Sequence, residues 1–519
     1  MKKTFLLAAT LIALTCTSVF AQGKATPIPS VMGPTPVTPE SYPWNAASKL
    51  QTPVDVTSKG YVEEEYFISG KSNVYDWAPD GSLKVLASDR PYTTRILLRR
   101  PIDPARFSGT VFVELAHSGR GYDYNAMWGY AWEYLLSHGD AYVAITISGN
   151  TINALKKFDN TRYSALSFPP PVPNVCGERA GGGERGGGAR GGGGGRGGGR
   201  GGAPPTFDDS VKWDVISQVG ALLKSKSPSN PLARYNVQYL FSSDHTASDT
   251  HTYARAFTKA ALTETGKPVF DGYLIKEGAG VGAVSPCGRI AADDPRRQFK
   301  NVGVPVIFLV SDNYAARLSS IRRDDSDQPG DQYRLYELAG SSHLDKWGPL
   351  YLPTLDDQKK LGVPLVSAAK GFEMECQQIQ PLSDFPVPYV YSAMLNHLDN
   401  WVRKGTAPPR ADRIKLENPG SPMAKVVTDM YGNGQGGIRN PWVDVPSSTF
   451  VSQMTGTSGP CDQVGYNLPL SMSKMEKLYG NSRNFQTRYF AGIDKMVREK
   501  WLLAPDAEKL KAQFRSANE

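Results

Sequence analysis

Apolar runs typical of strands alternate with segments of helical spacing through most of this chain, and that alternation limits the folds open to it. The run 304–310 is almost wholly apolar, as expected of a parallel strand buried on both faces. In 211–223, apolar residues recur at the spacing of one helix face. The alternation predicts an α/β fold with a mostly parallel central sheet flanked by helices. The other predicted strands are 61–68, 94–99, 110–115, 141–147, 237–241, 272–275 and 333–338, and the other predicted helices are 128–136, 246–260 and 389–402.

Most of the net charge of +8 comes from two segments outside this pattern. Residues 1–21 start with Lys2 and Lys3, continue as an apolar run and end at Ala21, which predicts an export signal. Residues 177–202 form a Gly/Arg insert with five Arg against two Glu, which we expect to be a flexible surface loop. The two segments contribute +2 and +3, so the rest of the chain carries only +3. This modest charge argues against a nucleic-acid partner.

After the signal, we expect an extended, proline-rich lead-in over 22–60 and a single elaborated domain over 61–519. The apolar run of the signal is too short to span a membrane in the mature protein, so we expect a periplasmic or extracellular protein. An even number of cysteines in an exported chain predicts two disulfides. Three pairings are possible among Cys176, Cys287, Cys376 and Cys461.

Polar residues suited to hydrolytic chemistry follow three of the predicted strands. Asp244 follows the strand that ends at 241, Asp312 follows 304–310, and His343 follows 333–338. In open parallel sheets, active groups collect at the carboxyl ends of the strands. The order nucleophile, acid, histidine along the chain is that of α/β-hydrolases. We therefore expect Asp244, Asp312 and His343 to form a catalytic triad.

Several blocks carry a family resemblance: 109–114 with 120–123 and 127–129, then 139–143, 333–343 and 437–446. In these blocks the chain resembles a family of bacterial, mostly exported α/β-hydrolase-domain proteins, over nearly its whole mature length. The resemblance implies an α/β-hydrolase fold with lid-like and C-terminal additions, and His343 as the catalytic histidine.

The resemblance fails at one position. The family carries a serine elbow of the form Gly-x-Ser-Gln-[Ser/Thr], and an ungapped match places Asp244 where the serine should be, with Ser242 for the glycine and His245 for the glutamine. Three interpretations stay open. Asp244 can be the nucleophile, as in haloalkane dehalogenases and epoxide hydrolases; Ser243 or Ser248 can serve through a register shift; or the site can be catalytically silent.

Backbone N–H groups beside the candidate nucleophile complete the expected site. His117 and Ser118 follow the strand 110–115, and His245 follows Asp244, which are the positions that supply an oxyanion hole in this fold. No CxxC or HExxH motif occurs, so we expect neither a metal nor a cofactor. The sequence thus predicts an exported hydrolase of a small ester-like or related molecule. The alternative is a silent protein that binds a small ligand in the same cleft, and the oligomeric state stays open.

Overall fold

A nine-stranded sheet forms the centre of the computed structural model, which describes residues 25–176, 206–245, 248–278, 280–288, 290–291, 294–371, 376, 381–454 and 459–516. The strand order is β1-β2-β3-β5-β4-β6-β7-β8-β9. The pairs from β5 to β9 are parallel, and the pairs that involve β1, β2 and β3 are antiparallel. The predicted α/β fold with a mostly parallel sheet is therefore confirmed. The strands are β1 (Ser30–Met32), β2 (Tyr61–Trp77), β3 (Leu83–Pro101), β4 (Thr110–Leu115), β5 (Ala141–Ile145), β6 (Tyr239–His245), β7 (Gly272–Lys276), β8 (Val306–Ser311) and β9 (Tyr333–Leu338).

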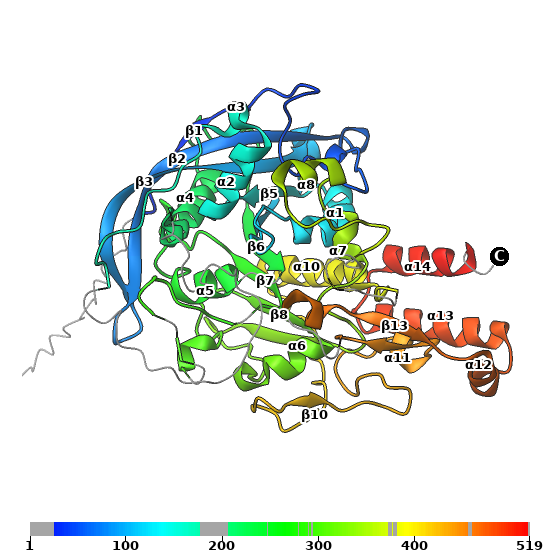
Figure 1. Cartoon of the computed structure of the whole chain (residues 1–519). Coiled ribbons are helices and arrows are strands. Elements are labelled where there is room, and N and C mark those ends of the chain that lie inside the picture. Colours follow the sequence, from blue (N-terminus) through cyan, green and yellow to red (C-terminus); the bar gives the residue numbers. More distant parts are fainter. Residues whose placement is uncertain are drawn as a thin grey trace, which may run out of the picture.

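The hairpin of β2 and β3 is much longer than the predicted strands 61–68 and 94–99. Its pairing runs from Tyr61↔Pro101 to Trp77↔Leu83, and Figure 1 shows it as a long curved ribbon beside the other strands. In this outer part, β3 buries no side chain between Leu83 and Pro91, and β2 buries only Ser72 and Val74. It therefore lacks the continuous apolar run of a strand buried on both faces. The lead-in contributes β1, which pairs with β2.

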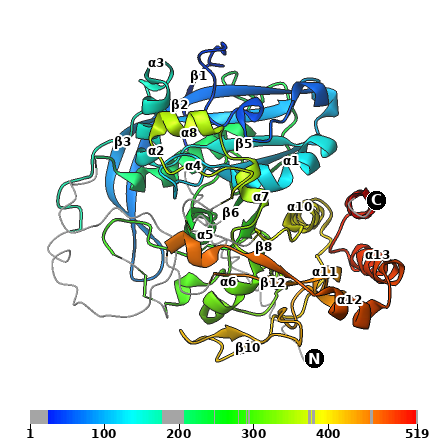
Figure 2. The ribbon, with the colours of Figure 1, turned by 45° about the vertical axis from the view of Figure 1, so that its right-hand side comes forward.

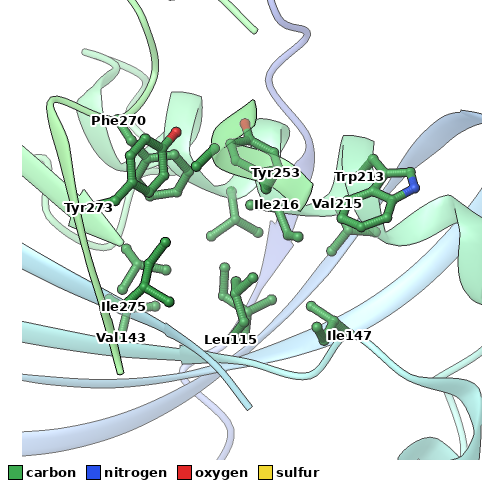
Figure 3. Packing of buried hydrophobic residues seen from close by; sticks show 14 of the residues in the cluster. Leu115, Val143, Ile147, Trp213, Val215, Ile216, Tyr253, Phe270, Tyr273 and Ile275 are labelled. Atoms are coloured by element: carbon green, nitrogen blue, oxygen red, sulfur yellow. The ribbon is translucent and has the colours of Figure 1, made fainter. Parts of the chain in front are cut away.

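Helices cover both faces of the sheet. On one face, α4 and α5 bury Trp213, Ile216 and Tyr253 against Leu115 and Ile275 (Figure 3). Full burial of one such apolar side chain contributes about 1.5–3 kcal/mol. The helices of this face are α2 (Gly149–Phe158), α4 (Lys212–Lys224), α5 (Ser248–Ala256) and α6 (Asp312–Arg317), and those of the other are α1 (Ala126–His138) and α10 (Val387–Lys404).

Three C-terminal helices extend the second face, beyond α10 (Figures 1 and 2). Tyr489, Ile493 and Leu510 from this region are buried in the same apolar cluster as Leu395 of α10. The expected C-terminal addition is therefore present and packs onto the sheet through α10. Its helices are α12 (Met472–Tyr479), α13 (Ser482–Arg498) and α14 (Ala504–Ser516).

Two disulfides join the four cysteines of the described residues, which settles the pairing that the sequence left open. Cys176 pairs with Cys287 and Cys376 pairs with Cys461, with Cα–Cα distances of 5.0 and 5.3 Å. Both distances lie within the usual range for such bonds. The predicted signal 1–21 and the Gly/Arg insert 177–202 lie outside the described residues. Within the described ranges, no helix is long and apolar enough to cross a bilayer.

Candidate active site

Three ionisable side chains meet at the carboxyl edge of the sheet. His245 ends β6, Glu277 follows β7, and His343 lies in the loop after β9. His343 Nδ1 donates a hydrogen bond to a carboxylate oxygen of Glu277, and His245 Nε2 lies 3.4 Å from the same oxygen. The two imidazole rings have centroids 5.1 Å apart. All three side chains are buried, so the parallel strands bring these groups together as the sheet geometry predicts.

Neighbouring residues fix both the backbone and the carboxylate of Glu277. Its backbone φ is +65°, a left-handed conformation that is uncommon outside glycine. Its Oε1 accepts from the Ser311 amide at 3.1 Å and lies 3.2 Å from Lys276 Nζ. Burial alone would raise the pKa of Glu277, but the charge of Lys276 and the hydrogen bond from His343 hold it well below its usual range. Glu277 is therefore a carboxylate at neutral pH.

His343 has the arrangement of a general base. Because Nδ1 is bonded to Glu277, Nε2 is the nitrogen left to take a proton, and it has no hydrogen-bond partner among the described residues. Burial lowers the pKa of His343, and the attraction of Glu277 only partly opposes this, so the ring is neutral at pH 7. Tyr314 of α6 stacks on the imidazole, with centroids 4.5 Å apart, which fixes the ring plane.

Lys276 occupies the place that a metal ion would need. Ligand atoms of His245, Glu277 and His343 lie within 4.8 Å of one another, as they would around a cation. The Lys276 ammonium, however, donates to His245 Nε2 at 3.0 Å and pairs with Glu277. A metal would have to displace a buried positive charge from its two partners, so these residues do not fit one.

Asp312, the expected acid, supports the loop that carries the histidine. It begins α6, its Oδ2 accepts from the Gly340 amide at 3.0 Å, and its own amide donates to Ser341 O at 3.3 Å. The carboxylate bonded to His343 is that of Glu277, on the neighbouring strand β7. Burial raises the pKa of Asp312 to about 7. Asp312 therefore holds the loop 340–341 through hydrogen bonds and is not bonded to His343.

Asp244 is buried within β6, one residue before its end. Side chains alternate along a strand, so Asp244 and His245 point to opposite faces. Thr250 of α5 lies beside the Asp244 carboxyl group, whose oxygens have no hydrogen-bond partner among the described residues. Burial raises the pKa of Asp244 well above its usual range, so this environment disfavours the charged carboxylate.

The two alternative serines lie in different surroundings. Ser243 Oγ donates to Leu274 O at 2.8 Å and shares a 2.5 Å hydrogen bond with the Tyr391 hydroxyl of α10. Its hydroxyl thus faces α10, and none of its hydrogen bonds within the described residues goes to His343. Ser248 opens α5, and its side chain lies outside the described part of the structure.

The loop after β4 supplies the expected N–H groups in part. The His117 amide donates to Tyr124 O at 2.9 Å, so it is already engaged. The Ser118 amide has no hydrogen-bond partner among the described residues. Burial, together with the nearby His343, lowers the pKa of the His117 side chain to about 4. Of the two residues, Ser118 therefore offers the free donor.

A small cavity with a mostly apolar surface has His245 in its wall. Its volume of about 10 Å³ is the space of about one water molecule. Tyr130 and Asp345 contribute polar groups, with the Tyr130 hydroxyl 3.3 Å from each carboxylate oxygen of Asp345. Burial raises the pKa of Asp345 to about 7. The full lining is Arg120, Tyr124, Tyr130, His245, Leu344, Asp345, Gly348, Pro349 and Leu352.

Comparison with known proteins identifies the family. The family model described as "Alpha/beta hydrolase domain" matches residues 31–512. The chain belongs to this family. Among curated proteins, none matches the chain. The expected α/β-hydrolase fold is thus confirmed for nearly the whole described chain, and the protein is assigned to a superfamily of hydrolases.

Solved structures with a similar fold differ strongly in sequence. Esterase Est22 is 11% identical, with 59% of this chain and 80% of that chain covered and a TM-score of 0.29. The poly(3-hydroxybutyrate) depolymerase LpqC from Bordetella parapertussis is 11% identical, with 66% and 92% covered and a TM-score of 0.26. A dienelactone hydrolase from Anabaena variabilis is 12% identical, with 57% and 96% covered and a TM-score of 0.27.

Glu277 and Lys276 are the site residues that the sequence prediction missed. The sequence does hold a signal for them: the predicted strand 272–275 is followed at once by Lys276 and Glu277 and then by Gly278. A carboxylate directly after a buried parallel strand satisfies the same rule that selected Asp312.

Proposed function

We propose that this chain is an exported hydrolase that cleaves a small ester-like substrate with His343 as general base and Glu277 as the carboxylate that orients it. The observation that carries the proposal is the bond from His343 Nδ1 to Glu277, with Nε2 left free. This is the geometry by which a carboxylate selects the imidazole tautomer and stabilises the imidazolium that forms. It takes the place of the expected pair of Asp312 and His343.

Water is the nucleophile that the site favours. Asp244 is buried and its pKa is raised by burial, which disfavours the nucleophilic carboxylate form. Carboxylate attack on an ester would also give a mixed anhydride. In addition, no serine, threonine or cysteine side chain of the described residues is hydrogen-bonded to His343. With no side-chain nucleophile paired to the base among these residues, we infer that water attacks the ester directly.

The proposed steps balance without a cofactor. His343 Nε2 removes a proton from water while the water oxygen forms a bond to the ester carbonyl carbon. In this proposal, the Ser118 amide stabilises the resulting oxyanion. The bond from that carbon to the alcohol oxygen then breaks, and His343 returns its proton to the leaving alkoxide. The products are a carboxylic acid and an alcohol.

Export is supported by the two disulfides. Disulfides persist in oxidising compartments such as the bacterial periplasm and the extracellular space, and both bonds join residues far apart in sequence. We therefore propose removal of residues 1–21 and a mature protein that works outside the cytoplasm.

A panel of short-chain p-nitrophenyl esters, epoxides and haloalkanes tests this function. We expect ester turnover by the mature protein, loss of turnover in His343→Gln, and activity close to wild type in Asp244→Asn. Intact mass measured during turnover should show no covalent adduct. An adduct that disappears in Asp244→Asn would contradict the water route and support the aspartate nucleophile.

One observation favours a second function, a silent ligand-binding protein. In the sequence match, Asp244 stands in place of the family's elbow serine and His245 in place of its glutamine, and both side chains are buried. In that case no substrate of the panel would turn over, and a non-hydrolysable ester analogue would raise the melting temperature of wild type and of His343→Gln equally.

A further inference from the structure

His251 is a buried histidine with no part in the proposed chemistry, yet it touches the site. It lies on α5, and its Nε2 is 2.5 Å from the backbone carbonyl oxygen of Glu277. A carbonyl oxygen can only accept, so the proton of His251 is on Nε2. The other nitrogen, Nδ1, is buried without a hydrogen-bond partner among the described residues. The single polar contact of this ring is therefore to the backbone of the proposed acid.

The Glu277 backbone needs such a contact. A φ of +65° in a residue that is not glycine is strained and persists only when the surroundings hold it. The amide of Glu277 donates to Leu309 O at 2.9 Å, and its carbonyl oxygen accepts from His251. The peptide group on each side of the left-handed residue is thus fixed by one hydrogen bond.

The packing around His251 leaves the ring no other position. Phe299 and Phe308 lie at centroid distances of 5.0 and 5.1 Å from the imidazole. On the remaining side, a Cβ added to Gly278 would lie 2.7 Å from His251 Nε2. Glycine is therefore required at 278 both by this close approach and by its own φ of +97°.

We propose that His251 is a positioning residue that holds Glu277 in the left-handed conformation which presents its carboxylate to His343. This inference rests on the proposed function, because it assigns Glu277 the role of orienting the base. It adds that α5, the helix that follows β6, sets the orientation of the Glu277 carboxylate through the Glu277 main chain.

Two substitutions separate the hydrogen bond from the packing. His251→Phe keeps an aromatic ring between Phe299 and Phe308 but removes the donor, and His251→Gln keeps an N–H at the distance of Nε2. We expect kcat to fall roughly 10- to 100-fold in His251→Phe with KM unchanged, because misplacement of a catalytic group by about 1 Å has effects of this order. His251→Gln should recover most of kcat. His138→Phe, at an exposed helix end, is the matched control and should match wild type.

A second readout does not depend on turnover. In ¹⁵N-histidine-labelled protein, the His343 Nδ1 proton bonded to Glu277 should give a strongly downfield signal that is absent in His343→Gln. We expect this signal in wild type and His251→Gln, and its loss or broadening in His251→Phe. Should His251→Phe fail to fold, His251→Asn, whose amide is too short to reach Glu277, replaces it.

The outcomes distinguish this inference from the proposed function. A folded His251→Phe variant with wild-type kcat and an intact signal would overturn the positioning role alone. Loss of kcat in both His251→Phe and His251→Gln, with the signal intact, would also overturn it. Absence of the signal in wild type would overturn the pair of His343 and Glu277, and with it both proposals.

Discussion

Lys276→Met gives a quantitative test of the electrostatics of the site. The side chain is buried between His245 and Glu277, and methionine has a similar length and no charge. The Nζ–Oε1 distance of 3.2 Å and an effective dielectric constant of about 20 give an attraction of about 5 kcal/mol. The cost of burying the ammonium offsets part of this attraction. We therefore expect a net loss of about 3 kcal/mol in the free energy of unfolding.

The same substitution should move the pH dependence of the reaction. Lys276 lowers the pKa of Glu277 and also that of His343. A general base works in its neutral form, so a lower pKa keeps the enzyme active at lower pH. Without the ammonium, the pKa of His343 rises and the acidic limb of kcat/KM moves to higher pH. We expect a displacement of about one pH unit, since each unit corresponds to about 1.4 kcal/mol.

The assay is the pH profile of kcat/KM on the best ester of the panel, with thermal unfolding measured on the same samples. Lys346→Met is the matched control, because this lysine is near His343 in sequence but half exposed, and its profile should coincide with that of wild type. An acidic limb that stays in place, or moves to lower pH, in folded Lys276→Met would refute the electrostatic reasoning.

Two further predictions concern stability. Replacing both Cys376 and Cys461 by serine removes a disulfide between residues 85 apart in sequence. Urea denaturation should show a free energy of unfolding lower by about 4 kcal/mol. An unchanged denaturation midpoint would contradict a stabilising disulfide at this place. Glu65→Gln breaks a buried ion-pair cluster with Arg95 and Arg162. It should lower the free energy of unfolding by about 3–5 kcal/mol, seen as a lower melting temperature. The exposed control Glu499→Gln should change the melting temperature little.

Sequence reasoning predicted the parallel part of the sheet well because buried parallel strands are continuously apolar. The run 304–310 matches β8, and 333–338 coincides with β9. It predicted the outer hairpin poorly, since the outer parts of β2 and β3 pair along their backbones but bury few side chains, among them Ser72 and Val74. Pairing of this kind depends on the partner strand and is only weakly reflected in the local pattern of apolar residues.

The histidine of the site was more accessible to sequence reasoning than its acid. His343 stands after a strand in a block that resembles a family, whereas the choice between Asp312 and Glu277 depends on which carboxylate reaches Nδ1. Both follow buried parallel strands, so the topology rule admits both. The structure separates them through the left-handed backbone of Glu277 and the amide of Gly340 that engages Asp312. Neither feature has a signature in one sequence.

The most direct test of the account compares Glu277→Gln with Asp312→Asn in kcat/KM for ester hydrolysis. Both substitutions replace a carboxyl group by an uncharged amide of the same shape, which keeps a hydrogen-bond acceptor. If Glu277 orients the base, Glu277→Gln should lower kcat/KM by about 10³- to 10⁴-fold, and Asp312→Asn should lower it by less than about tenfold, since an amide oxygen can still accept from Gly340. A large loss in Asp312→Asn with near-normal activity in Glu277→Gln would contradict the account.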